Sequence, residues 1–328
     1  MEDAEYIREL EIGDREAEKR RERIEEEVET RGASQWQLVW RRFRKNKPAL
    51  VGAGILIVIL FMAVSAPFLT YVGILADPNS TQFLIDPPEL GGGGRALPSI
   101  FHLLGTDKLG RDVLSRIFWG AQTALIVGIV AMIISTLIAF TIGGLAGYFG
   151  GRVDAALMVV TDVFLVMPVF LIMLLMIKIL TVIVVSGFGL WVVIGVLGIF
   201  GWPQMARMIR AEFFRLKTLD YVEAARELGA SNRRIMVRHI LPNALGPIIV
   251  VFTLGIAYNI LAEAGLSFLG FGDASTVSWG WMINMELEIV SVQPLLVLFP
   301  AVAIFFTVLA FNLMGDGLAD ALDPRLWR

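Results

Sequence analysis

The chain has 328 residues, of which 56% are apolar and 18% are charged, and its mean hydropathy is +0.70. Soluble domains average about 45–50% apolar and about 25% charged residues, so this composition argues against a water-soluble enzyme. The sequence contains no cysteine, which excludes disulfides, thiolate metal sites and cysteine nucleophiles. Two widely separated histidines cannot supply a three-histidine metal site, and the net charge of −3 gives no indication of a nucleic-acid partner.

The first 35 residues differ in composition from the rest of the chain. Residues 1–35 carry 13 acidic and 7 basic side chains, whereas residues 36–328 carry 18 acidic and 21 basic ones. Glutamates and arginines of the first segment often lie three or four positions apart, which is typical of a solvated helix. We expect residues 1–35 to be a charged cytoplasmic leader, either such a helix or a partly disordered tail, with a partner-docking helix as the alternative.

An amphipathic segment follows at 36–48. Trp36, Trp40 and Phe43 fall on one helical face, and five basic residues and Pro48 accompany them before the first apolar run. Aromatic rings favour the headgroup region and cations favour anionic lipid, so this pattern predicts an interfacial elbow helix in contact with membrane lipid.

Long apolar runs predict an all-α polytopic membrane protein with six transmembrane helices. A span needs roughly 20 largely apolar residues to cross the hydrocarbon layer. The first helix is assigned to 49–72, and Pro168 is expected to kink the third. The run 155–205 carries only two charged residues and divides into two spans at a turn around 181–188. The remaining spans correspond to the runs 117–151, 240–262 and 289–315.

Loop charges predict the orientation. With a cytoplasmic amino terminus, the inner segments 36–48, 149–154, 205–243 and 317–328 carry 16 basic residues and the outer segments carry four. Positive charge marks cytoplasmic loops, so both termini are placed in the cytoplasm of a multi-pass cell-membrane protein. Residues 73–116 become an extracytoplasmic segment, in which Thr106 and Asp107 are expected to cap the next helix. The core then covers 117–316, and 317–328 form a cytoplasmic tail.

The cytoplasmic loop at 218–243 carries the strongest local pattern. Asp220 followed by Glu223 has the spacing of a capping box, and Gly229 suits the left-handed position that closes a helix. A second short helix is expected over 232–240, ended by Pro242. This loop therefore predicts a small, rigid helix pair standing on two spans, with arginines around it.

These residues resemble a known motif. The chain matches the EAA loop of bacterial and archaeal ABC importer permeases at Glu223, Ala224, Ala225, Gly229, His239, Ile240, Leu241 and Pro242. Further segments are similar to the C-type permease subunit of dipeptide, oligopeptide and nickel importers. These segments are LGTDKLGRDVLSR at 104–116, AEAGLSFLG at 262–270, SWG at 278–280, GDGL at 315–318 and LDPR at 322–325.

The resemblance implies a type I ABC importer permease fold with an EAA coupling helix pair, and a non-catalytic role. Members pair with a B-type permease as a heterodimer, with two ATPase subunits that bind ATP and Mg, and with an extracytoplasmic solute-binding protein. The chain lacks a Gly-Lys pair and hence a phosphate-binding loop, which agrees with hydrolysis on separate subunits. No cofactor or metal is expected in this chain. The implied ATPase-coupling residues are Glu223, Ala224, Ala225, Gly229, His239, Leu241 and Pro242.

Two acidic residues inside predicted spans are candidates for the translocation path. Asp162 is expected to face the bundle or the path, since an ionised side chain within a span is costly, and Asp154 shares its helical face. An arginine of the loop is the alternative partner for Asp162. Glu263, near the outer end of the fifth span, is expected to contact an external gate or to serve in capping or pairing.

Other functions are less consistent with these patterns. A self-sufficient channel or secondary transporter predicts inverted repeats or a charged relay, and an intramembrane enzyme predicts a catalytic motif; none of these is recognisable here. The expected function is peptide import as the permease subunit of an ATP-driven importer. Nickel or another small solute, including a sugar-type solute, remains the alternative cargo.

Overall fold

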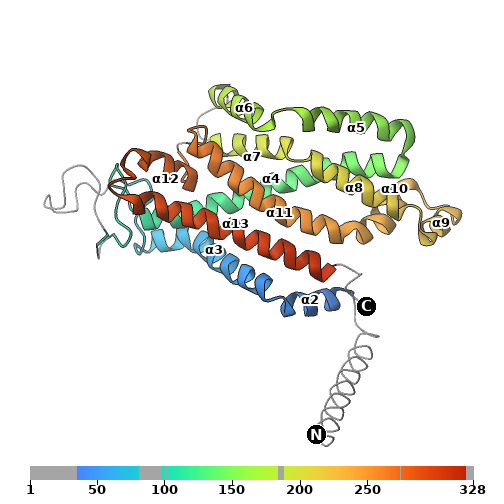
Figure 1. Cartoon of the computed structure of the whole chain (residues 1–328), viewed down its shortest axis with the longest axis horizontal. Helices are drawn as coiled ribbons and strands as arrows, with labels where there is room; N and C mark the ends of the chain where they lie inside the picture. The colour runs from blue at the N-terminus through green and yellow to red at the C-terminus, as the bar shows by residue number, and fades with distance from the viewer. Residues whose placement is uncertain (1–34, 81–97, 100–101, 184–187, 274, 323–328) are drawn as a thin grey trace, which may run out of the picture.

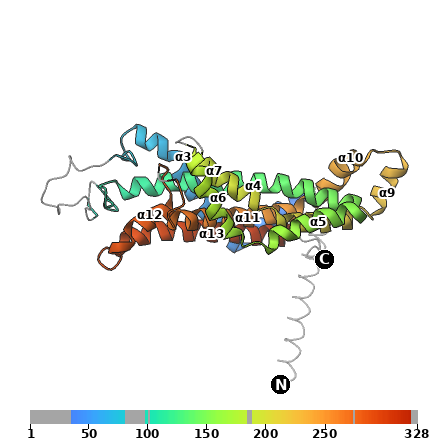
Figure 2. The ribbon, with the colours of Figure 1, turned by 90° about the horizontal axis from the view of Figure 1, so that it is seen from above.

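The computed structural model describes residues 35–80, 98–99, 102–183, 188–273 and 275–322, and their regular elements are all helical. In chain order they are α2 (Gln35–Lys45), α3 (Lys47–Tyr71), α4 (Val113–Phe149), α5 (Gly151–Val166), α6 (Val169–Ile183), α7 (Gly189–Phe200), α8 (Pro203–Leu216), α9 (Asp220–Glu227), α10 (Asn232–Arg234), the π-helical turn η2 (Ile235–Ile240), α11 (Leu241–Phe268), α12 (Trp279–Glu286), the 3-10 turn η3 (Leu287–Ile289) and α13 (Pro294–Leu322). The long helices form an elongated bundle, with α12 at one end and α9 at the other (Figures 1 and 2).

Among the described helices, four are unbroken, long and apolar enough to cross a membrane: α3, α4, α13 and the continuous stretch Asn232–Phe268. Two further candidates are bent pairs. The pair α5 and α6 is bent by 83°, and the pair α7 and α8 is bent by 42°. The bundle therefore offers four spans, or six if each bent pair crosses once.

A proline lies at each of the two bends. The predicted kink at Pro168 is confirmed: Met167 has an extended ψ of 144°, because the residue before proline avoids the helical region. The second bend was not predicted. It lies at Gly201 and Trp202, where Pro203 begins α8. The sequence does contain a signal for this break, Pro203 two residues after Gly201, but the absence of charges alone led us to expect one helix over 188–205.

Helix α4 lies at the centre, where it packs against α3, α7, α8 and α11. Its contact with α8 depends on two glycines. A Cβ on Gly143 would collide with the backbone of Ala206, and a Cβ on Gly147 would lie 2.5 Å from the carbonyl oxygen of Arg210. These two glycines are thus used for helix packing within the chain. Gly151, four positions after Gly147, begins α5 with a φ of 54°.

Helix α2 packs against the C-terminal part of α13. Val39 and Phe43 are buried there with Ala49 and Ala321, whereas Trp40 is 61% exposed. The side chain of Asn46 accepts from the amide of Ala49, which caps α3, and donates to Asp320 at 3.0 Å. The predicted aromatic face is therefore divided between protein and surroundings, and α13 continues to Leu322, beyond the expected end at 316.

We predict that Gly147→Ala destabilises the protein by about 1–3 kcal/mol, because the added methyl group forces two packed backbones apart. Gly54→Ala, inside α3, is the matched control, since a Cβ there meets no atom within 4 Å. The measurement is the temperature at which half of the purified protein in detergent leaves the monodisperse peak in size-exclusion chromatography. Equal midpoints for the two variants would show that the contact between α4 and α8 tolerates a side chain.

Candidate functional site

The first candidate site is the knuckle, defined as residues 220–240, which protrudes at one end of the bundle (Figures 1 and 2). Helix α9 begins at Asp220, and its N-cap is Leu219, which forms no side-chain cap bond. The prediction that Asp220 caps this helix is wrong by one position. Leu219 already has an extended backbone, with ψ of 145°, and its carbonyl accepts the amides of Val222 and Glu223.

Gly229 closes α9 in the left-handed conformation, with φ of +81°, as predicted. The amide of Gly229 donates to the carbonyl of Arg226, and the amide of Ala230 donates to that of Ala225. This is the Schellman arrangement, which satisfies carbonyls at the end of a helix and strongly favours glycine. A Cβ at Gly229 would meet no atom within 4 Å, so conformational strain alone limits this position.

The second arm of the knuckle differs from the expectation. Ser231 caps α10, which passes into η2 and then without a stop into α11, so Pro242 does not end a helix. Pro242 is the second residue of α11, directly after the π-helical turn η2, and the helix continues past it. The knuckle is therefore connected directly to a long helix.

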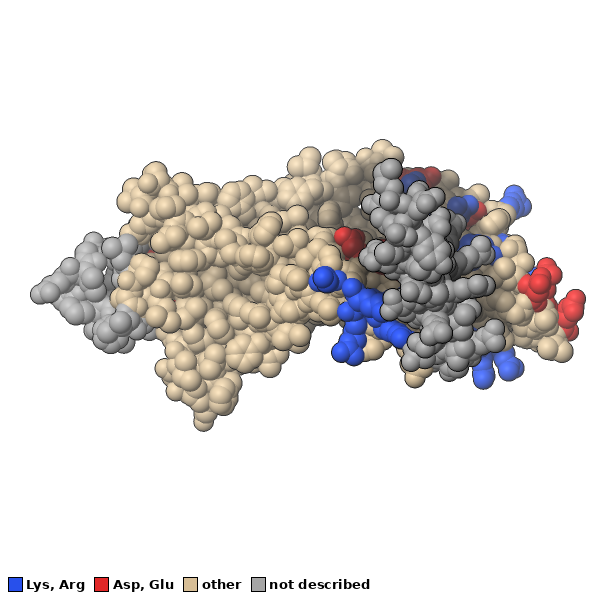
Figure 3. Space-filling model, turned by 60° about the horizontal axis from the view of Figure 1, so that its bottom comes forward, with Lys and Arg blue, Asp and Glu red and all other residues tan. Residues whose placement is uncertain are grey.

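Burial separates two faces of α9. Val222 is fully buried and Ala225 is 7% exposed, whereas Glu223 and Ala224 are exposed and Leu228 is 88% exposed. His239 and Leu241 are half-buried and Pro242 is exposed. The structure thus brings the predicted motif residues into one protrusion with an outward face that is partly apolar. Figure 3 shows charged side chains concentrated on the half of the visible surface that ends in the knuckle.

Polar contacts attach the end of α8 and the knuckle to the end of α4. Lys217 donates to the carbonyls of Gly147 at 2.8 Å and Tyr148 at 3.2 Å, where a cation is favoured by the helix dipole. The hydroxyl of Tyr148 donates to the side-chain oxygen of Asn232 at 2.8 Å. Asn243 donates to the carbonyl of His239 at 2.8 Å. Hydrogen bonds and chain continuity thus connect the knuckle to the ends of α4, α8 and α11.

The carboxylates predicted on one face of α5 pair with arginines of α8. Asp162 lies 2.6 Å from Arg207, with side chains 54% and 53% exposed. Asp154 accepts both Nε and Nη2 of Arg210, the latter at 2.5 Å. The sequence analysis named an arginine of the cytoplasmic loop as a possible partner for Asp162 but did not identify Arg207 or Arg210. These arginines become neighbours of the carboxylates only after α8 folds back along α5.

Glu263 lies in a different part of the bundle from Asp162. It sits in the last two turns of α11, is 4% exposed, and accepts the hydroxyl of Ser267 at 2.7 Å. The helix α12 covers this region, since a Cβ on Gly280 would collide with the backbone of Ala264. The structure therefore does not bring the two predicted path residues together.

A second candidate site lies at the other end of the bundle, in the outer loop, defined as residues 102–112. Asp107, expected to cap the next helix, instead organises this loop. Its carboxylate accepts the amides of Leu109 at 2.9 Å and Arg111 at 3.0 Å, and both Nε and Nη2 of Arg111 at 2.7 Å. The cap of α4 is Asp112, which accepts the amide of Ser115 at 2.7 Å. The sequence alone could not show which of these two acidic residues caps α4, because this depends on the geometry of the loop.

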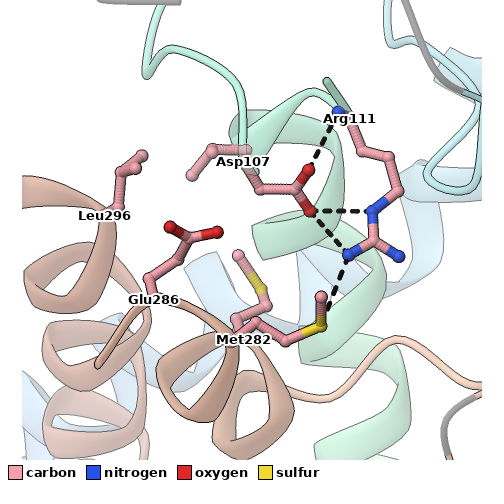
Figure 4. A pocket seen from close by; sticks show the side chains of 7 residues that line it. Asp107, Arg111, Met282, Glu286 and Leu296 are labelled. Carbon is pink, nitrogen blue, oxygen red and sulfur yellow. Dashed lines mark hydrogen bonds and ion pairs between the residues drawn. The ribbon is translucent and has the colours of Figure 1, made fainter. Parts of the chain in front are cut away.

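A small pocket joins this loop to α12 (Figure 4). Glu286 faces Asp107 across the pocket and accepts the amide of Lys108 at 2.9 Å, while Arg111 approaches the sulfur of Met285 at 3.8 Å. Trp279 at the start of α12 donates to the carbonyl of Ile117 at 3.0 Å. The charged groups thus bond to the protein itself, and the pocket is a structural junction between the loop, α4 and α12.

One further acidic residue, Asp273, holds the start of α7. It accepts the amides of Leu190 at 3.1 Å and Ser275 at 2.9 Å and the hydroxyls of Ser275 and Thr276. Burial alone would raise the pKa of Asp273, but these hydrogen bonds together lower the pKa below its ordinary value. Among the described residues, no cluster of three or more His, Cys, Asp or Glu side chains could hold a metal ion.

Comparison with known families identifies the architecture. Residues 139–328 match the family described as binding-protein-dependent transport system inner membrane component. Residues 34–87, which include α2 and α3, match the N-terminal TM domain of oligopeptide transport permease C. The first match covers more than half of the chain and includes the whole knuckle.

Individual relatives agree with these families. The dipeptide transport system permease protein DppC of Bacillus subtilis is 41% identical over 294 residues, covering 89% of this chain and 86% of that protein. The oligopeptide transport system permease protein OppC of the same organism is 37% identical, covering 92% and 93%. The glutathione transport system permease protein GsiD of Pectobacterium atrosepticum is 37% identical, covering 89% and 91%.

A solved structure supports the fold. The MetNI methionine ABC transporter in an inward-facing conformation includes a chain with a TM-score of 0.52 and 19% identity, covering 63% of this chain and 96% of that one. The family models and the relatives confirm the expected resemblance to C-type ABC importer permeases, and the protein is a multi-pass membrane protein. The chain belongs to the family of inner membrane components of binding-protein-dependent transport systems, as an ABC importer permease of the C type.

Proposed function

We propose that this chain forms half of the transmembrane pathway of an ATP-driven peptide importer and carries no catalytic site of its own. The knuckle is the observation that supports this most directly. It presents exposed apolar and charged side chains at one end of the bundle, and it is fastened to three long helices. Such a protrusion suits a partner that pushes and pulls, which is what a chain without a phosphate-binding loop requires.

The proposed assembly contains four kinds of subunit. This chain pairs with a B-type permease, two ATPase subunits bind ATP and Mg and dock on the permease knuckles, and an extracytoplasmic solute-binding protein delivers the cargo. The proposed ATPase contact is the exposed face of α9, which includes Glu223, Ala224 and Leu228. His239 and Leu241 are half-buried and act through packing of the second arm, and Pro242 begins α11.

The proposed cargo is a dipeptide or oligopeptide. Relatives with 37–41% identity are named as dipeptide, oligopeptide and glutathione permeases, and glutathione is itself a small peptide. These names favour peptides over nickel or another small solute. A self-sufficient secondary transporter is disfavoured, because it would have no ATPase partner whose movement the knuckle could transmit.

We place six spans in the membrane, with each bent pair crossing once, and both termini in the cytoplasm. The excess of lysine and arginine in 205–243 supports this orientation. Helix α2 is the interfacial elbow, with basic residues in its last turn. Asp162 remains the candidate for lining the path, since more than half of its side chain is exposed. Glu263 is buried and bonded to Ser267, which supports a pairing role instead of an external gate contact.

The orientation predicts a labelling pattern. In this cysteine-free chain, a membrane-impermeant thiol reagent applied to intact cells should label Asn79→Cys and should not label Ser231→Cys. Both positions are exposed, so burial does not explain a difference between them. Permeabilised cells provide the control, in which both variants should react. Labelling of Ser231→Cys from outside would overturn the proposed topology.

The knuckle predicts an uncoupling phenotype. Gly229→Val adds strain of about 1–2 kcal/mol at a left-handed residue, which corresponds to about a 5- to 30-fold loss in a docking equilibrium. Glu223→Lys should act in the same direction but more weakly, because it places a cation at the start of α9 against the helix dipole. The measurements are co-purification of the ATPase subunits and ATP-dependent peptide uptake in reconstituted vesicles.

Two control variants separate docking from general damage. Gly73→Val introduces the same strain at a φ of +77°, just beyond α3 and outside the knuckle. Glu288→Lys reverses the charge of an exposed residue in η3, outside the knuckle. Both controls should retain the ATPase subunits. Normal uptake and full ATPase recovery for Gly229→Val and Glu223→Lys would exclude the knuckle as the coupling element.

A further inference from the structure

Helix α5 has unusually little apolar contact with the rest of the chain. Thr161 is the only one of its residues that is buried, whereas α4 buries residues along its whole length. Val159, Val163 and Val166 are between 49% and 86% exposed. The main apolar contact of α5 is Phe164, whose ring centroid lies 5.2 Å from that of Trp202 and 5.8 Å from that of Phe200. No residue of the first half of α5, 151–158, is buried, so directional polar contacts contribute more to the position of that half.

Two ion pairs, here called the clamp, connect α5 to α8. They are Asp154 with Arg210 and Asp162 with Arg207. The later residue of α5 pairs with the earlier residue of α8, so the two helices run in opposite directions at the clamp. Asp154 and Asp162 are eight residues apart, or about 12 Å along a helix, so the pairs grip α5 at two separate levels. Two separated contacts restrain both sliding and tilting of α5 against α8.

The two pairs are not equivalent. Arg210 donates through two nitrogens to the two oxygens of Asp154, the fork geometry that is both strong and directional. The side chains of this pair are 16% and 38% exposed. Arg207 donates to Asp162 through one bond, and both side chains are more than half exposed, which weakens an ion pair. Asp154 and Arg210 therefore carry most of the restraint.

Arg210 occupies a position that cannot shift independently. Its backbone packs against Gly147 of α4, where a Cβ would lie 2.5 Å from the Arg210 carbonyl oxygen. Three and six residues later, Phe213 and Leu216 are buried, and Lys217, the next residue, bonds to the end of α4. Helix α8 then leads through Thr218 and Leu219 into α9. The guanidinium of Arg210 thus projects from a stiff helix, α8, that leads into the knuckle.

We propose that Asp154 and Arg210 are positioning residues that make α5 follow α8 when the knuckle moves. The motion then reaches the bend at Met167 and Pro168, beyond which α6 packs on α7 through the buried Met173 and Ile177. This inference rests on the proposed coupling of the knuckle to an ATPase. One bidentate ion pair would then connect the knuckle to α5, a helix that is not next to the knuckle in the sequence.

The test compares single variants with the exchanged pair in the reconstituted complex. Asp154→Asn and Arg210→Gln should lower ATP-dependent peptide uptake about tenfold relative to ATP hydrolysed, while recovery of the ATPase subunits stays normal. The double variant Asp154→Arg with Arg210→Asp should restore uptake, because the exchanged charges can pair again. The matched control is Arg215→Gln, which removes a 2.8 Å ion pair with Glu212 that lies within α8 alone. This control should transport normally.

A covalent cross-link in place of the ion pair tests the connection between α5 and α8 without relying on charge. The double variant Asp154→Cys with Arg210→Cys should lose uptake, and bridging the two thiols with a bis-methanethiosulfonate reagent should restore it. Reductant cleaves the bridge and should abolish uptake again. The chain contains no other cysteine, so the bridge within it is defined. Normal uptake before bridging, or no recovery after it, would contradict the proposal.

Hydrogen exchange tests the clamp without relying on transport. In the purified permease, Arg210→Gln should speed amide exchange in the α5 stretch 155–166 but leave α11 and α13 unchanged, and Arg215→Gln should do neither. Unchanged exchange in α5 would overturn the clamp, as would normal uptake by Arg210→Gln. If the wild-type complex takes up no peptide, the proposed function fails, while the exchange experiment still decides whether the ion pair holds α5.

Discussion

The backbone contact between α4 and α8 is the constraint on which the other features depend. Gly143 and Gly147 leave no side chain between the helices, so α8 lies directly against α4 and its direction is set. That contact places Arg210 within reach of Asp154 and Lys217 within reach of the last carbonyls of α4. Without the two glycines, the knuckle would stand on a helix whose position relative to the bundle was not determined.

The two ends of the bundle use buried charge in different ways. In the outer loop, Asp107 takes four hydrogen bonds from its own loop, and Glu286 then fastens that loop to α12. Such a network is rigid, because removing Asp107 or Arg111 leaves the buried charge of the other without this partner. At the other end the charges join separate helices and are partly exposed. Ion pairs of this kind are better suited to a connection that moves than a closed, buried network is.

Helix continuity also differs between the halves of the chain. The stretch Asn232–Phe268 continues from the second arm of the knuckle into a long apolar helix, so displacement of that arm is carried along one rod. On the first arm the path passes through α8, which the bend at Gly201 and Trp202 separates from α7. The clamp to α5 gives this arm a second connection to the bundle. The two arms of the knuckle thus act on different helices.

The sequence alone predicted several features, because each depends on residues close together along the chain. They are the apolar runs, the kink at Pro168, the left-handed Gly229 and the EAA spacing. These features determined the helical class, most helix positions and the family. Tertiary structure alone decided that Asp112 and not Asp107 caps α4, that Pro242 begins a helix, and that Arg207 and Arg210 meet the carboxylates of α5. Such choices depend on which backbones lie side by side after folding, and the spacing of residues along the chain does not specify those neighbours.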